Sequence, residues 1–257
     1  MSRPPGAPVL SPPEPTRAHR WRWTLGLGAV LLAGATAVVL HSPWMSVREI
    51  EILGAVEADV AGRLAEAGVG EGAIMIWLNQ AEIEAAVAAD PWVREVRVSR
   101  IFPSRLVVEV LEHTPAAWVA GEDSWMLISP GGVVIATADA PGEGLLRAEV
   151  FYPDREAGEQ PEGSEWGELA ALGSALGPDL AARAWVTREG GELWLRADGC
   201  RARLGPATQL ADKGRALAAL LSDGLPVGSQ VNLVSPTRPA VTGPSGDAAE
   251  GAGEPPG

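Results

Sequence analysis

The chain has 257 residues, a net charge of −13 and one cysteine. This length allows one or two domains with their own cores, and a single cysteine excludes an intramolecular disulfide. An acidic surface without a basic stripe would repel phosphate backbones, so the composition argues against nucleic-acid binding.

An apolar run lies near the N-terminus, beginning at Thr24 and ending at Leu40. With Trp23 it is long enough for a membrane helix of roughly 17–25 residues, and four arginines against one glutamate precede it, as is typical of a cytoplasmic flank. We therefore expect a disordered cytoplasmic segment over residues 1–22 and a transmembrane anchor over 23–43. A cleaved signal peptide is the alternative, since residues 35–37 have the small side chains of a cleavage site.

The next segment, residues 46–113, combines strand and helix signals. Residues 47–53 alternate like a strand, and residues 56–67 have helical spacing before Gly68. Asn79, with an acid three residues later, predicts the N-terminus of a second helix, which Pro91 ends. Two alternating strands follow at about 93–110. The predicted order is β-α-α-β-β, with both helices on one face of a three-stranded sheet.

The two strands of the hairpin meet at a corner formed by Arg100, Phe102 and Pro103. We expect Pro103 to hold the turn, because its ring fixes the backbone φ angle. We expect Phe102 to pack near the sheet, where its ring would bury a large apolar area.

Strand signals dominate residues 114–241, with two helices expected at about 166–176 and 208–221. This pattern predicts a mostly-β domain, followed by a disordered tail of Gly, Pro, Ala and acidic residues at 242–257. Cys200 lies in a strand-like stretch without a nearby histidine, so we interpret it as a packed side chain and not as a nucleophile. Most tryptophans of this domain should belong to the core.

The last strand-like segment, residues 231–241, contains Pro236 and Pro239. Proline lacks the N–H that a central strand needs, so the segment is expected at a sheet edge. An exposed edge can accept a strand from another chain. The alternative is that the prolines protect the edge against aggregation.

The sequence lacks the motifs of common enzyme classes. It contains no HExxH, GxSxG, P-loop or CxxC pattern, and His113 lies at a strand end, where a surface position is more frequent than a metal site. We therefore expect no catalytic residues, no metal and no cofactor.

Five stretches carry a family resemblance: VREIEILG at 47–54, ADPWVREVRVSRIFPSRLVVEVLEHTPAAW at 89–118, ELWLRADGCRARLG at 192–205, KGRALAALL at 213–221 and PTRPAV at 236–241. Together they resemble the FtsQ/DivIB type of bacterial cell division protein. The resemblance implies an α+β chain: a single transmembrane helix, a POTRA domain of the FtsQ type at 46–113 and a mostly-β C-terminal domain at 114–241.

The resemblance also implies a non-enzymatic scaffold at midcell. Its N-terminus would be cytoplasmic and its bulk outside the cell membrane, where it would bind FtsB- and FtsL-like single-span partners. The last strand is the family's main FtsB-contacting element, which by position implies Val231, Asn232, Leu233, Val234, Ser235, Thr237, Arg238, Ala240 and Val241. An envelope secretion or assembly factor bearing a POTRA domain is the alternative.

Overall fold

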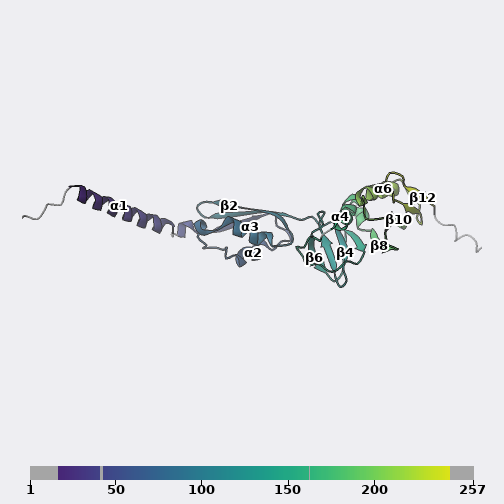
Figure 1. Cartoon of the computed structure of the whole chain (residues 1–257), viewed down its shortest axis with the longest axis horizontal. Helices are drawn as coiled ribbons and strands as arrows, with labels where there is room; N and C mark the ends of the chain where they lie inside the picture. Colours follow the sequence, from purple (N-terminus) through teal and green to yellow (C-terminus); the bar gives the residue numbers. More distant parts are fainter. Residues whose placement is uncertain (1–16, 41–42, 162, 244–257) are drawn as a thin grey trace, which may run out of the picture.

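The computed structural model describes residues 17–40, 43–161 and 163–243, arranged as a long helix followed by two sheet-containing domains (Figure 1). The helix α1, Arg17–Leu40, leads into a short 3₁₀ turn η1, Pro43–Met45. The expectation of disorder is wrong for residues 17–22, because their arginines and alanine favour helix and extend α1 toward the N-terminus. Residues 1–16 and the predicted tail beyond residue 243 lie outside the described residues.

The apolar run of residues 24–40 forms the C-terminal part of α1. Large side chains in this part point into open space, with Leu31 65% exposed and Val38 73% exposed. Among the helices of the described chain, none reaches the length and mean hydropathy that a membrane-crossing segment requires.

The first domain contains a three-stranded sheet and two helices. Its elements are β1 (Glu49–Leu53), α2 (Val60–Glu66), η2 (Met75–Trp77), α3 (Gln80–Ala88), β2 (Val93–Ile101) and β3 (Arg105–Glu112). β3 is the central strand, parallel to β1 and antiparallel to β2. Side chains of the two helices pack with those of the sheet in one core, which includes Leu64, Val87, Leu106 and Val108. The predicted β-α-α-β-β order is confirmed.

The helix ends of this domain follow their local sequence signals. The side chain of Asn79 accepts a hydrogen bond from the Ala81 N–H at 3.2 Å, as expected of an N-cap. After α2, the N–H of Gly68 bonds the Ala65 carbonyl and the next N–H bonds the Leu64 carbonyl. Gly68 has a φ of +71°, so this is the glycine-terminated Schellman arrangement.

The hairpin corner differs from expectation at Phe102. Arg100 is structural, because its guanidinium donates to the Leu78 carbonyl at 3.0 Å. The expected packing of Phe102 against the sheet is wrong, since its side chain is 54% exposed. Phe102 lies just beyond the end of β2 and is not among the residues that pack in the core of this domain. Pro103 follows it at the tip, after a cis peptide bond.

The second domain is built on one nine-stranded sheet with three helices. Its strands are β4 (Ala117–Ala120), β5 (Trp125–Ile128), β6 (Val134–Ala138), β7 (Leu146–Glu149), β8 (Trp185–Glu189), β9 (Glu192–Ala197), β10 (Cys200–Gly205), β11 (Gln230–Asn232) and β12 (Ala240–Thr242). Its helices are α4 (Ser164–Leu176), α5 (Pro178–Ala181) and α6 (Leu210–Ser222). The sheet order is β12-β11-β10-β9-β8-β7-β4-β5-β6. The predicted β-rich domain and its two longer helices are confirmed.

The two long helices pack against each other, and their apolar side chains share one core with the sheet. Gly173 permits the close approach of α4 to the sheet, because a Cβ at this position would lie 2.4 Å from the Ala116 carbonyl oxygen. A second, smaller cluster holds Trp118, Leu127 and Ile135, with Trp92 of the first domain packed against it. The two domains are therefore joined by side-chain packing as well as by the chain.

Candidate functional site: the open edge of the second sheet

The two edges of the nine-stranded sheet differ. At one edge, Val134 of β6 donates to the Glu159 carbonyl at 2.9 Å and accepts from the Gly158 N–H at 2.8 Å, so the loop before α4 covers the start of this strand. At the other edge lies β12, whose three residues are all exposed. In the described part of the chain, β11 is the only strand that pairs with β12. The sheet thus has one partly covered edge and one open edge.

The hydrogen bonds of β11 determine which groups of β12 face outward. The Leu233 N–H donates to the Arg203 carbonyl at 2.8 Å, and the Ser229 carbonyl accepts from the Arg201 N–H at 3.1 Å. Odd-numbered residues of this segment therefore direct their backbone groups toward β10. Even-numbered residues direct theirs toward β12.

The consequence for β12 follows from the antiparallel register. Gln230 lies opposite Thr242 and Asn232 lies opposite Ala240, so these pairs exchange the hydrogen bonds. Val241, opposite Val231, is the residue between them, and residues at such positions point their N–H and C=O away from the partner strand. The backbone groups of Val241 therefore face the open edge, and its side chain is 45% exposed.

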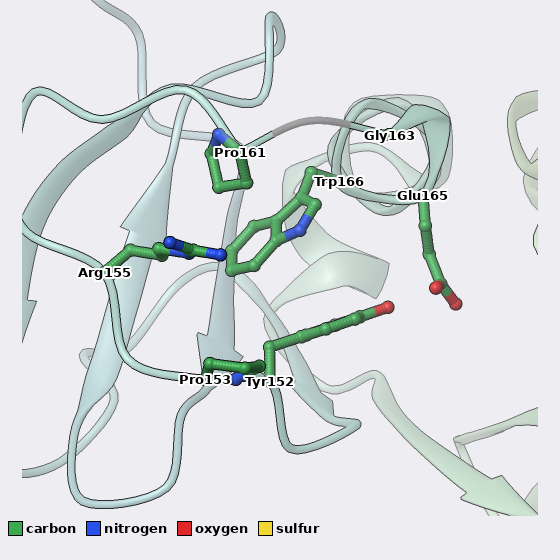
Figure 2. Close-up of a pocket in the computed structure, with 7 residues that line it drawn as sticks. All are labelled: Tyr152, Pro153, Arg155, Pro161, Gly163, Glu165 and Trp166. Atoms are coloured by element: carbon green, nitrogen blue, oxygen red, sulfur yellow. The ribbon is translucent and has the colours of Figure 1, made fainter.

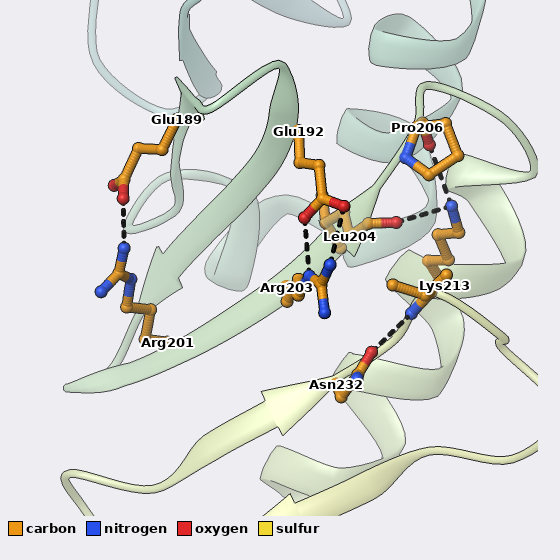
Figure 3. A network of polar contacts seen from close by, with 9 residues as sticks. Glu189, Glu192, Arg201, Arg203, Leu204, Pro206, Lys213 and Asn232 are labelled. Atoms are coloured by element: carbon orange, nitrogen blue, oxygen red, sulfur yellow. Dashed lines mark hydrogen bonds and ion pairs between the residues drawn. The ribbon is translucent and has the colours of Figure 1, made fainter.

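The segment 231–241, expected as a single strand, is instead two short strands and a connecting loop. The Asn232 side chain accepts from the Val234 N–H at 3.1 Å, a local turn that ends β11 (Figure 3). The loop then carries Ser235, Thr237 and Arg238 together with both prolines, which explains why the strand does not continue.

The predicted partner-binding residues consequently fall into two groups. Val231 is 2% exposed and Leu233 is fully buried, so these two side chains belong to the core and present nothing to a partner. The remaining seven predicted positions are accessible: Asn232, Val234, Ser235, Thr237, Arg238, Ala240 and Val241. Of these, only Ala240 and Val241 lie in the edge strand itself.

A buried cation supports the strands beneath this edge. Lys213 of α6 is 1% exposed, and its Nζ donates to the carbonyls of Leu204 at 2.7 Å and Pro206 at 3.0 Å (Figure 3). Burial lowers the pKa of this ammonium group, while the charge of Glu168 acts in the opposite direction. The two hydrogen bonds fix the end of β10, on which β11 and the turn after it rest.

Ion pairs cover the face of the sheet opposite the helices. Arg203 donates to both carboxylate oxygens of Glu192, at 2.6 and 2.7 Å, and Arg201 contacts Glu189 (Figure 3). The hydrogen bond from Arg203 lowers the pKa of Glu192. The Arg201 guanidinium also lies 4.2 Å from the ring centre of Trp194. This face is therefore polar up to the strand beside β11.

A separate pocket of about 420 Å³ lies where the loop after β7 meets α4 (Figure 2). The rings of Tyr152 and Trp166 form its floor, with centroids 4.8 Å apart, and the Tyr152 hydroxyl accepts from Arg188 at 3.1 Å. Burial raises the pKa of Tyr152, and Glu165 acts in the same direction. Sequence patterns gave no indication of this pocket, because its loop has no periodic element.

Two further expectations concern single residues of the second domain. Cys200 is 4% exposed and its Sγ lies 3.5 Å from the Pro226 carbonyl, as expected of a packed side chain. Trp118 and Trp166 are buried. Trp125 and Trp185 are only half-buried and meet edge to face, with ring centroids 6.5 Å apart.

Comparison with known proteins matches the first domain to a family model. Residues 45–113 match the POTRA domain of the FtsQ type. This match covers the sheet of β1 to β3 with its two helices, and begins at the last residue of η1.

Curated relatives extend the similarity beyond that domain. The chain is 33% identical over 135 residues to the cell division protein FtsQ of Myxococcus fulvus, which covers 52% of this chain and 47% of that protein. It is 26% identical over 219 residues to FtsQ of Mycobacteroides abscessus, covering 83% and 66% of the two chains. The chain thus spans about half the length of the Myxococcus fulvus relative.

A third relative matches over more than two thirds of both sequences. Over 215 residues the chain is 30% identical to the cell division protein FtsQ of Anaeromyxobacter sp., which covers 77% of this chain and 72% of that protein. Together with the POTRA match, this similarity shows that the chain belongs to the FtsQ family.

Proposed function

We propose that this chain is a non-enzymatic scaffold of the bacterial division machinery, which accepts a strand from an FtsB-like protein at the open edge formed by β12. The observation that carries the proposal is the orientation of Val241, whose backbone N–H and C=O face outward from the last strand of the sheet. A strand added there would gain backbone hydrogen bonds irrespective of most side chains.

The exposed residues of β12 and of the loop before it would act together in binding a partner strand. Val241 would pair its backbone groups with the incoming strand and add an apolar contact, while Ala240 holds β12 to β11. Ser235, Thr237 and Arg238 lie in the exposed loop before β12, where they can contact a segment that extends beyond the added strand. The contribution of Asn232 and Val234 is indirect, since their hydrogen bond holds the turn that leads into this loop.

We further propose that residues 24–40 anchor the chain in the cell membrane, with the N-terminus in the cytoplasm and both domains outside it. The support is the continuous helix α1, its exposed leucine and valine side chains and the arginine-rich segment before it. With an FtsL-like protein as a second single-span partner, such a chain would link early and late division proteins at midcell.

Site-specific photocrosslinking in growing cells tests the proposed edge. A photoreactive side chain at Val241 is expected to capture a small single-span division protein. The matched control is Thr137, which is exposed on β6 at the opposite edge of the same sheet. Equal capture of the same protein from both positions, or capture of no such protein from Val241, would contradict the proposal.

A further inference from the structure

Five exposed apolar side chains gather at one end of the first domain: Trp44, Ile76, Trp77, Ile101 and Phe102, here called the proximal cluster. They are 76%, 40%, 68%, 50% and 54% exposed, respectively. They come from three separate segments of the chain, namely η1, η2 and the tip of the β2–β3 hairpin. A soluble surface rarely keeps so many large apolar groups together without a function.

Backbone hydrogen bonds hold these three segments together. Ser46, directly after η1, forms a β-bridge with Ile74, directly before η2. The hairpin tip joins the same end through Ser104, whose carbonyl accepts from the Arg48 N–H at 2.9 Å. The Arg100 side chain completes the arrangement by bonding the Leu78 carbonyl after η2. The cluster is therefore a defined surface and not a set of loose loops.

This surface lies at the end of the domain where α1 arrives. β1 begins beside the hairpin tip and runs away from α1, β3 runs parallel to it, and β2 returns to the tip (Figure 1). From Leu40, the last residue of α1, to Pro43, the first of η1, the chain can span at most about 11 Å. Trp44 is the next residue. The cluster is thus tethered within a short distance of the end of the proposed anchor.

From this placement we infer that the proximal cluster rests on the lipid bilayer that holds the chain's own anchor. The inference depends on the proposed membrane anchor at residues 24–40. Tryptophan is the side chain that favours the membrane–water interface, and two of the five side chains are tryptophans. Apolar groups on such a surface enter the boundary between headgroups and acyl chains, to a depth of roughly 5–10 Å. The first domain would then be oriented on the membrane, so that the second domain points away from it.

Fluorescence quenching by lipid tests this contact on the full-length chain. Cys200 is the one native cysteine, so Cys200→Ala allows a single environment-sensitive label at a chosen cysteine. The label is placed at Phe102→Cys in one protein and at Ile101→Cys in a second. The proteins are reconstituted in phosphatidylcholine vesicles with a minor phosphatidylglycerol component. The vesicles contain no nitroxide, a phosphatidylcholine with a nitroxide near its headgroup, or a phosphatidylcholine with a nitroxide near the end of an acyl chain.

Two further label positions separate the possible outcomes. Phe151→Cys is the matched control, because Phe151 is also exposed, at 66%, but lies in the second domain. Ala33→Cys lies inside the proposed anchor. We expect labels at Phe102 and Ile101 to lose about half of their emission or more to the headgroup nitroxide, since groups at interfacial depth approach that probe closely. The label at Ala33, near the middle of the proposed anchor, should lose a similar share to the acyl-chain nitroxide. The label at Phe151 should lose almost none.

One outcome would overturn the inferred contact and leave the anchor proposal intact. In that outcome the label at Ala33 is quenched, but the labels at Phe102 and Ile101 are quenched no more than the label at Phe151. If the label at Ala33 is not quenched, the anchor proposal fails and the inferred contact fails with it.

Discussion

The ammonium group of Lys213 donates to the backbone carbonyl of Leu204 at 2.7 Å, from a side chain that is 1% exposed. This bond, with the one to Pro206, ties α6 to the end of β10. Since β10 pairs with β11, and β11 with β12, the open edge of the sheet rests on this contact.

Replacement of Lys213 by Met should therefore destabilise the second domain. The substitution keeps the length of the side chain but removes the Nζ donor from the buried Leu204 carbonyl, which should lower the free energy of unfolding by about 1–3 kcal/mol. The Pro206 carbonyl keeps the Thr208 N–H as a donor, at 2.8 Å. Urea unfolding of the full chain, followed by the tryptophan fluorescence, measures the change. Arg203→Met is the matched control, because its ion pair with Glu192 is roughly 40% exposed on both sides and such pairs contribute only about 0–1 kcal/mol. Equal losses in the two variants would contradict the role assigned to Lys213.

Glu112 should make the stability of the first domain depend on acidity. Burial raises its pKa, but its Oε1 accepts the N–H groups of Ala58, Val56 and Glu57 at 2.8–3.0 Å, and the net pKa is lowered. Because the folded pKa lies below the unfolded one, this stabilisation is complete above the ordinary glutamate pKa, about 4.3. It is lost as the pH falls through the folded pKa.

At neutral pH, Glu112→Gln is expected to lower the free energy of unfolding by about 1–2 kcal/mol. The variant should therefore unfold at a lower urea concentration. Its stability should also decline less steeply in acid than that of the unmodified chain. Glu109→Gln, at an exposed position of the same strand, is the control and should follow the unmodified chain. Parallel pH profiles for Glu112→Gln and the unmodified chain would rule out this role.

Two glycines of the same helix should respond oppositely to alanine. At Gly173 a Cβ would lie 2.4 Å from the Ala116 carbonyl, so Gly173→Ala should force α4 from the sheet and cost about 1–3 kcal/mol. At Gly167 nothing lies within 4 Å of the added Cβ, so Gly167→Ala should stabilise the helix by up to about 1 kcal/mol. Thermal unfolding of the two variants provides the comparison. A stabilising Gly173→Ala would show that the helix sits farther from the sheet.

Local signals in the sequence predicted most elements of both domains. The Asn79 cap, the glycine after α2 and the alternating valines of the hairpin depend on neighbours a few residues away, and the structure confirms them. The prediction for Phe102 was wrong because the large apolar area of its ring does not show whether another part of the chain covers it. The loop between β7 and α4 carries no periodic pattern, so the pocket that it lines could be found only from the fold.

The candidate site was only partly predictable. Two prolines in residues 231–241 suggested an edge, but the turn made by Asn232 and Val234 divides the segment. Leu233 is buried in the same core as Val231. The sequence did contain a pattern that indicates the burial of Lys213. Lys213 falls at helical spacing between Leu210 and Leu217, on the face of α6 that is buried in the structure. The carbonyls that it binds come from β10 and the residue just beyond it, and this proximity is a property of the tertiary structure.

The central claim is that a partner strand adds to β12. The most direct test introduces Val241→Pro into the full chain and measures its affinity for the FtsB-like division protein of the same cell. Proline removes the one N–H that faces outward, and because this N–H makes no bond to β11, folding should be preserved. We expect affinity to fall at least about tenfold, equivalent to 1.4 kcal/mol, with an unchanged urea unfolding curve. Ala240→Pro is the comparison, since its N–H faces β11 and its loss should destabilise the edge strand itself. Full affinity in a folded Val241→Pro chain would contradict the account.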